Sequence, residues 1–226
     1  MSVWIVFIPR EQANAKTKDS TGNADGLFGE AKSWVSDSNG KLDENNILFS
    51  TDSLPAPLLA SAETTLYIMG GHGKEGRSFL TWPGESNPLC CHQLGDLIQA
   101  AGLPQTFAGT IKVYSCLSAD NSGSSVAFAK LFAEYMAHLG YTNCRIFGYT
   151  GAVSKSYVNS GTETAPLGGV AKLKFKVKDE LGKGKHRYAL TTGGWGTRAN
   201  EAKRDFTVKP GVDPIIKACA ICHRFG

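Results

Sequence analysis

The sequence has no stretch that approaches the ~20 consecutive apolar residues that a helix needs to cross a bilayer. Its first residues, MSVWIVFIPREQ, lack a basic leader and a small-residue cleavage site. We therefore interpret the apolar run from Val3 to Pro9 as a first strand and not as a signal peptide. We expect no membrane contact and a cytoplasmic location, or delivery as an effector without a classical signal peptide.

The chain also lacks a strong charge of either sign. Its 24 Lys and Arg residues and 20 Asp and Glu residues give a net charge of +4, which is too mild to indicate nucleic-acid binding. Six cysteines are too few for a disulfide scaffold in 226 residues, so free thiols in a reducing compartment are expected. No internal repeat or low-complexity tract is present, and 42% hydrophobic residues are enough for a real core.

Predicted strands and helices alternate through the first two thirds of the sequence. Short β-branched and aromatic runs predict strands at 3–8, 45–50, 64–70, 110–116 and 144–149. Apolar residues at helical spacing predict helices at 26–37, 92–102 and 121–140. A serine cap is expected before Val126 in the last of these, and Gly140 is expected to end it. This alternation predicts an α/β fold with a mostly parallel sheet and helices on its faces.

The last third has a different pattern. The segment VAKLKFKVKDELGKGKHRYAL alternates lysine with Leu173, Phe175 and Val177. This period of two predicts a half-buried strand with a lysine-bearing face, then a glycine-containing turn and a return strand. We interpret it as a β-hairpin added to the α/β core. The chain is then a single domain over 1–226, with its core at about 1–195 and a C-terminal extension at 196–226.

The segment YIMGGHGKEG contains Gly71, Gly73 and Gly76 at the G-x-G-x-x-G spacing of a dinucleotide-binding loop. That loop needs a helix to begin at its third glycine, because the helix N-terminus binds the pyrophosphate. Here Pro83 and Pro88 follow, and no acidic residue ends a strand about 20 residues further on. The spacing is therefore only a weak indication of nucleotide binding.

The same segment places His72 after the strand at 64–70, and Cys116 ends the strand at 110–116. In a parallel sheet the carboxyl ends of neighbouring strands share one edge, where active sites form. A nearby imidazole activates a thiolate and protonates a leaving amine, while the N–H groups of Gly73 and Cys116 can face an oxyanion. The alternative is a buried structural thiol and a hydrogen-bonded loop histidine. The pattern alone does not decide between them.

The segments LYIMGGHGKEG and IKVYSCLSAD together resemble the caspase-like (clan CD) cysteine peptidases. Their shared pattern is an apolar strand, His-Gly, and a second apolar strand that ends in the nucleophilic cysteine. Within that clan, GHGK and the later lysine-alternating segment are most similar to the autoprocessing cysteine protease domains of large bacterial toxins. The resemblance covers roughly residues 60–195 in the order of elements. The QAC-G signature of caspases is absent, which argues against a true caspase with aspartate specificity.

This resemblance implies a caspase-like fold and peptide-bond hydrolysis by a Cys–His dyad without a metal. It makes Cys116 the nucleophile, His72 the general acid and base, and Gly73 and Cys116 the donors to the oxyanion; it identifies no third catalytic residue. We therefore expect a cysteine endopeptidase acting on a protein or peptide substrate, with self-cleavage and the oligomeric state left open. The alternative is a catalytically inactive caspase-like module that binds a partner or acts as a scaffold.

The resemblance also assigns the pocket for the residue before the scissile bond (P1) to the loop GYTGAVSKS. The candidate lining residues are Thr150, Gly151, Ala152 and Val153. The loop has no acidic residue for a basic P1 side chain and no arginine for an acidic one, which favours a small or apolar P1 residue.

A basic strip runs along the predicted hairpin. Its members are Lys172, Lys174, Lys176, Lys178, Lys183, Lys185 and Arg187. The toxin domains are switched on by inositol hexakisphosphate at a basic site, and a strip of this kind can bind such a polyanion. A charge run on a strand is more often a solvated face, so both interpretations stay open.

Two cysteine-histidine clusters are candidate metal sites. CAICH near the C-terminus matches the C-x-x-C-H pattern of c-type haem attachment, and Cys90, Cys91 and His92 are adjacent. Neither cluster has the spacing or the partners that haem or zinc needs, so no metal is expected.

Overall fold

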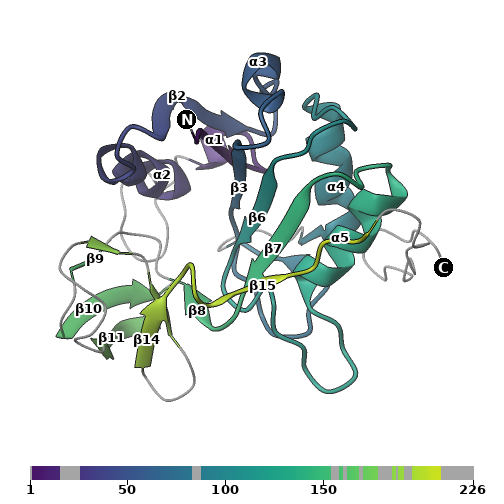
Figure 1. The fold of residues 1–226 in the computed structure, drawn as a ribbon. Helices are drawn as coiled ribbons and strands as arrows, with labels where there is room; N and C mark the ends of the chain where they lie inside the picture. The colour runs from purple at the N-terminus through teal and green to yellow at the C-terminus, as the bar shows by residue number, and fades with distance from the viewer. Residues whose placement is uncertain are drawn as a thin grey trace.

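The computed structural model describes residues 2–15, 26–82, 88–153 and 199–209 in full, and the backbone of the strands between residues 158 and 198. The described residues form a six-stranded main sheet with helices on both faces and a second, five-stranded sheet beside it (Figure 1).

The main sheet has the strand order β15-β7-β6-β3-β1-β2. Its strands are β1 Trp4–Ile8, β2 Leu42–Phe49, β3 Thr65–Met69, β6 Thr110–Tyr114, β7 Arg145–Tyr149 and β15 Lys203–Asp205. Five strands run parallel, and β15 is antiparallel to β7 at one edge. β15 comes from the stretch assigned by sequence to the C-terminal extension. The predicted α/β class with a mostly parallel sheet is confirmed.

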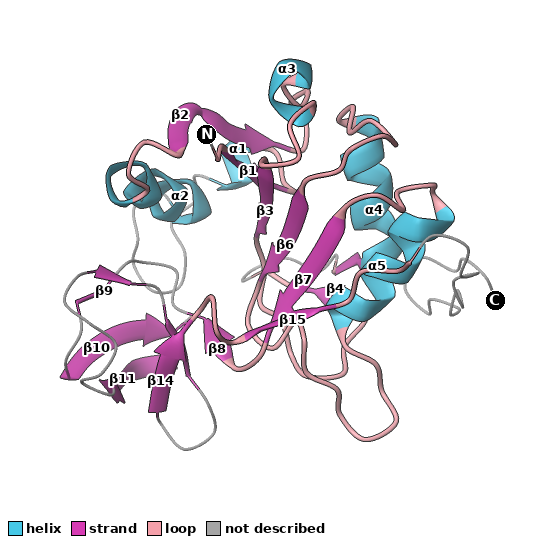
Figure 2. Ribbon diagram, in the orientation of Figure 1, coloured by secondary structure: helices cyan, strands magenta, loops and turns pink. Residues whose placement is uncertain are grey.

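Helices cover both faces of this sheet (Figure 2). The described helices are α1 Gln12–Ala15, α2 Gly26–Asp37, α3 Ala56–Leu59, α4 Cys91–Ala100 and α5 Phe128–His138, of which α3 lies beyond the amino ends of the strands. Because strand side chains alternate, Ile68 and Val113 pack under α4 and α5 in one fully buried layer. The other layer places Trp34 of α2 against the rings of Tyr67 and Tyr114, with centroids 5.3 and 4.9 Å away. Each such side chain stabilises the fold by roughly 1.5–3 kcal/mol, so the two layers hold the sheet from both sides.

Short strands complete the described fold. The second sheet has the order β10-β11-β14-β13-β8, and two small pairs, β4-β5 and β9-β12, lie outside both sheets. The bounds are β4 Phe79–Leu80, β5 Leu89–Cys90, β8 Ala152–Val153, β9 Val158–Asn159, β10 Thr162–Leu167, β11 Val170–Val177, β12 Lys185–His186, β13 Tyr188–Leu190 and β14 Trp195–Arg198. β8 begins just after β7, so the second sheet starts at the carboxyl edge of the main sheet.

The helix predicted at 121–140 is wrong at its amino end, because α5 begins only at Phe128. Ser122 and Ser125 instead exchange backbone hydrogen bonds of 3.1 and 2.9 Å in an exposed turn. The predicted serine cap is also wrong: Ala127 is the N-cap residue, and its own N–H donates to Asn121 Oδ1 at 2.8 Å. Serine and asparagine side chains offer the backbone such local turns in competition with a helix.

The predicted β-hairpin is wrong in its pairing. β11 forms, but within the described backbone its neighbours are β10, antiparallel, and β14, parallel. The expected return strand is divided between β12, which pairs with β9, and β13, which pairs with β14 and β8. β10 is not predicted, because TETAPL has little hydrophobic alternation and contains a proline. Only Gly168 and Gly169 connect β10 to β11 in the sequence, and so short a connection costs little entropy to close.

Candidate active site

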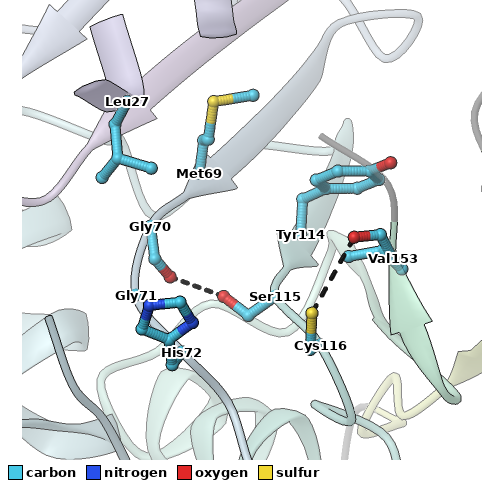
Figure 3. A pocket seen from close by; sticks show the side chains of 9 residues that line it. All are labelled: Leu27, Met69, Gly70, Gly71, His72, Tyr114, Ser115, Cys116 and Val153. Atoms are coloured by element: carbon cyan, nitrogen blue, oxygen red, sulfur yellow. Dashed lines mark hydrogen bonds between the residues drawn. The ribbon is translucent and has the colours of Figure 1, made fainter. Parts of the chain in front are cut away.

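Two loops meet at the carboxyl edge of the main sheet, where β3 and β6 end side by side. The strands are parallel neighbours, with Met69 opposite Tyr114 at their ends. His72 follows β3 and Cys116 follows β6, and both line one pocket (Figure 3). The structure thus brings together the two residues on which the sequence hypothesis depends.

A short β-bridge fixes the backbone of His72. The His72 N–H donates to the Thr81 carbonyl at 2.6 Å, and the Thr81 N–H donates back at 3.2 Å. Gly71, just before, has a φ of 73°, and a Cβ there would lie 2.8 Å from the Cβ of Leu80. Glycine adopts this left-handed conformation readily, whereas other residues are strained in it. Gly71 therefore makes the turn that presents the imidazole at the sheet edge.

Gly76, the third glycine of the loop, packs against the turn at 121–125. Its N–H donates to the Asp120 carbonyl at 2.8 Å, and a Cβ would lie 2.7 and 2.8 Å from the Cβ atoms of Ser122 and Ser125. Strand β4 and no helix follows within residues 77–82. The loop therefore lacks the helix N-terminus that a dinucleotide would need.

Gly73 is the closest point of contact between the two loops. A Cβ at Gly73 would lie 1.9 Å from the Cys116 carbonyl oxygen and 3.6 Å from the Cβ of Ser115. The residue after His72 therefore touches the backbone of Cys116 itself. The Gly73 N–H donates to no backbone carbonyl among the described residues, so it is available to a bound group.

The residue after Cys116 is held in a strained conformation. Leu117 has a φ of 57°, a left-handed value that an L side chain adopts at a cost of roughly 1–2 kcal/mol. Its N–H donates to the Gly151 carbonyl at 2.7 Å, which holds the chain in this turn. Backbone strain of this kind gathers at functional sites, where the surrounding structure maintains it.

Two hydroxyl groups anchor the Cys116 loop to neighbouring strands. Ser115 Oγ donates to the Gly70 carbonyl at 2.6 Å, which links the ends of β6 and β3. Ser118 Oγ donates to the Val113 carbonyl at 3.0 Å and accepts from the Tyr149 N–H at 2.9 Å. Both serines are buried, so these hydrogen bonds fix the loop from both sides.

The pocket beside the two residues has largely apolar walls. They are contributed by Leu27, Met69, Tyr114 and Val153. The enclosed part of the cavity is only about 20 Å³, and the rest of the hollow is open to solvent. The Cys116 thiol points to the Val153 carbonyl, with 3.8 Å between Sγ and the oxygen (Figure 3). An apolar hollow next to a thiol is suited to an aliphatic side chain.

The loop predicted to line the P1 pocket contributes one side of it. Val153 lines the pocket, as expected. Thr150 instead bonds to the Ala202 carbonyl through both its N–H and its hydroxyl, each at 2.9 Å. Gly151 supports the turn at Leu117, and Ala152 pairs with β13. Sequence reasoning missed Leu27, Met69 and Tyr114, whose positions depend on how α2 packs on the sheet.

Cys116 differs from the other described cysteines in its exposure. Cys90, Cys91, Cys116 and Cys144 are not in disulfide bonds, and Cys116 alone of these four is partly exposed. Burial raises the pKa of the Cys144 thiol to about 11, so it stays protonated at neutral pH. Among the described residues, Cys116 is thus the thiol that a reagent or substrate can reach.

Several predicted residues cannot be placed. Lys178, Lys183, Arg187 and the CAICH segment lie outside the described residues. The backbone of Lys172, Lys174 and Lys176 lies in β11 and that of Lys185 in β12. Within the described part of the chain, no group of three His, Cys, Asp or Glu side chains could hold a metal ion.

A cation cluster that was not predicted lies on the α2 face of the main sheet. Lys203 Nζ lies 4.9 Å from the centroid of the Phe147 ring, and the Arg145 guanidinium lies 4.8 Å from it. Lys112 of β6 is opposite Phe147 of β7 in the strand pairing. Burial lowers the pKa of Lys203, and the charge of Lys112 lowers it further. Arg145 pairs with Asp205 at 2.9 Å. The cluster therefore brings three positive charges near one carboxylate.

No protein-family model matches the chain, and neither a curated protein nor a solved structure matches it. Among the described helices, none combines the length and the apolar character that crossing a membrane requires. We therefore infer function from the sequence motifs and from the geometry of the site.

Proposed function

We propose that this chain is a cysteine endopeptidase with a caspase-like fold, in which Cys116 is the nucleophile and His72 the general acid and base. The observation that supports it most strongly is that these residues, from loops after neighbouring parallel strands, line one pocket. The motif order around them resembles clan CD, and most of all the autoprocessing domains of large bacterial toxins.

In the first half of the proposed reaction, the Cys116 thiolate attacks the carbonyl carbon of the scissile peptide bond. A C–S bond forms, and the carbonyl oxygen takes up negative charge. The N–H groups of Gly73 and Cys116 donate to this oxyanion, and losing one such donor typically costs 10²–10³-fold in rate. The His72 imidazolium then protonates the amine nitrogen, the C–N bond breaks, and the amine product leaves.

In the second half, water hydrolyses the thioester. Neutral His72 takes a proton from the water, whose oxygen attacks the thioester carbon. The same two N–H groups stabilise the second oxyanion. The C–S bond breaks, Cys116 returns to its starting state, and the new carboxylic acid leaves.

The pocket supports a preference for an aliphatic P1 residue. Its walls at Leu27, Met69 and Val153 are aliphatic or thioether groups without charge, and Tyr114 adds an aromatic ring with a neutral hydroxyl. A charged P1 side chain would lose its hydration there without an opposite charge to compensate, which is unfavourable. We expect leucine or a residue of similar size next to the scissile bond.

A polyanion such as inositol hexakisphosphate is the proposed activator. The basic strip predicted to bind it has its side chains outside the described residues. Lys112, Arg145 and Lys203 form a second candidate site. These cations share one sheet face, where the Arg145 guanidinium already pairs with Asp205. A bound anion would relieve the charge repulsion between Lys203 and Lys112, so the three cations are a candidate site for a phosphorylated ligand.

An electrophilic peptide-like probe with leucine at P1 tests the proposal. Wild type should take up one probe at Cys116, Cys144→Ala should label normally, and Cys116→Ala should not label. His72→Ala should label at least about ten-fold more slowly, because general-base help contributes 10²–10⁴-fold. Labelling spread over all six thiols, with no cleavage of an unfolded protein substrate, would contradict the proposal.

The same experiment separates the enzyme from an inactive caspase-like binding module. A module of that kind retains the pocket but not a reactive dyad. It predicts equal, slow labelling of wild type and His72→Ala, and no peptide cleavage by either protein.

A further inference from the structure

Asp120 bonds to all three loops that build the candidate active site. Its backbone oxygen accepts from the Gly76 N–H at 2.8 Å, which ties it to the His72 loop. Its carboxylate oxygen Oδ2 accepts from the Gly151 N–H at 2.8 Å, which ties it to the loop that ends in Val153. Asp120 itself belongs to the loop that follows Cys116.

The last two of these loops form a closed ring of hydrogen bonds. The Asp120 carboxylate accepts from the Gly151 N–H, and the Gly151 carbonyl accepts from the Leu117 N–H at 2.7 Å. The Leu117 carbonyl accepts from the Asp120 N–H at 3.1 Å, which closes the ring. The carboxylate is the one side-chain member of this ring, since the other contacts are made by backbone atoms.

The ring includes the strained residue that follows the nucleophile. Leu117, with its φ of 57°, would relax toward an ordinary conformation if its N–H lost the Gly151 carbonyl. Relaxation would rotate the peptide group that joins Cys116 to Leu117. It would also release the chain leading to Val153, whose carbonyl faces the Cys116 thiol.

We propose that Asp120 is a positioning residue. Its carboxylate fixes the Gly151 turn, and the Gly151 carbonyl in turn keeps Leu117 in the strained conformation that orients Cys116 toward His72. The inference rests on the proposed function, because it assigns Asp120 a role in the reactivity of Cys116. A carboxylate that accepts from a backbone N–H makes a strong, charge-assisted hydrogen bond, and here its acceptor oxygen is the essential feature.

The test compares Asp120→Ala and Asp120→Asn with wild type and with Asp52→Ala. Asp52 is a matched control, because its Oδ2 also accepts a backbone N–H at 2.8 Å, from Phe49 at the end of edge strand β2. Four quantities are measured: the rate of Cys116 alkylation by iodoacetamide, kcat and KM for a leucine-P1 peptide, and the urea midpoint. Asp120→Ser, whose oxygen is one bond short of Gly151, replaces the alanine variant if that variant does not fold.

We expect Asp120→Ala to lower the alkylation rate and kcat by about ten-fold or more with little change in KM. Asp120→Asn keeps an acceptor oxygen and should stay within about three-fold of wild type. Asp52→Ala should lower the urea midpoint as much as Asp120→Ala and leave the alkylation rate unchanged. Rescue by asparagine is an effect that a general loss of stability would not produce.

The inference would be overturned if Cys116 in Asp120→Ala is alkylated at the wild-type rate. It would also be overturned if Asp120→Asn is alkylated as slowly as Asp120→Ala, or if Asp52→Ala slows alkylation equally. The proposed function fails separately, if wild type alkylates at Cys116 but cleaves no peptide. Alkylation by a small reagent needs no peptidase activity, so the ranking of the variants still tests Asp120 in that case.

Discussion

Replacement of Gly73 by alanine tests whether the His72 and Cys116 loops must touch. The new Cβ would lie 1.9 Å from the Cys116 carbonyl oxygen and 3.1 Å from its carbonyl carbon. Both are backbone atoms, so no side-chain rotation relieves the clash. One loop must therefore move by at least about 1.1 Å, which is what separates 1.9 Å from the 3.0 Å that real Cβ contacts keep.

A shift of this size should affect activity much more than stability. Misplacing reacting groups by about 1 Å can reduce the rate 10²-fold, so we expect peptide cleavage and probe labelling at Cys116 to fall about 100-fold. Overpacking typically lowers the free energy of unfolding by about 1–3 kcal/mol. Labelling rates are measured by mass spectrometry, and unfolding free energies by urea titration.

Gly109→Ala is the matched control for this substitution. A Cβ at Gly109 would lie 2.4 Å from the Thr64 carbonyl oxygen, which is also a backbone clash but at the amino edge of β3 and β6. Gly109→Ala should lose a similar amount of stability and keep its labelling rate. If Gly73→Ala labels within about three-fold of Gly109→Ala, the close contact is not what aligns the two residues, and the reasoning is refuted.

Three further predictions concern the pocket, a buried thiol and the cation cluster. Leu27→Ala should shift the P1 preference from leucine toward phenylalanine, by about ten-fold in the ratio of the kcat/KM values measured on two matched peptides. An unchanged ratio would show that Leu27 does not limit the size of the pocket. The Cys144 pKa is raised from 9.0 to about 11, so its contribution to stability is complete below pH 9 and is lost as the pH rises from 9 to 11. Urea unfolding should therefore show a steeper loss of stability over this range for wild type than for Cys144→Ala, and parallel curves would count against it. Inositol hexakisphosphate at about 100 times its Kd should stabilise wild type by roughly 2.7 kcal/mol, measured as a shift in the unfolding temperature. Lys112→Met and Lys203→Met should lose this shift, and equal shifts in all three proteins would place the anion elsewhere.

The sequence predicted the strands and the shared edge because both follow from local patterns. Apolar runs such as TLYIM are buried along their whole length, and parallel pairing then brings the ends of β3 and β6 together. Residues 72 and 116 could therefore be paired without any knowledge of side-chain packing.

The features that were not predicted depend on contacts between distant segments. Leu27 reaches the pocket because α2 packs through Trp34 against the aromatic side chains of the sheet. Asp120 gains its role from the Gly151 turn, which belongs to a different loop. β11 pairs with β10 and β14, which are separate segments of the sequence. The periodicity of β11 alone predicts a strand but does not determine its partners.

Cleavage of a mixed peptide library tests the central claim most directly. Wild type and Cys116→Ala are incubated with the same peptides, and the products are identified by mass spectrometry. We predict pairs of fragments from wild type whose masses add up to the parent peptide plus one water, with an aliphatic residue before each cut, and intact peptides from Cys116→Ala. Intact peptides with wild type, or the same fragments from Cys116→Ala, would contradict the account.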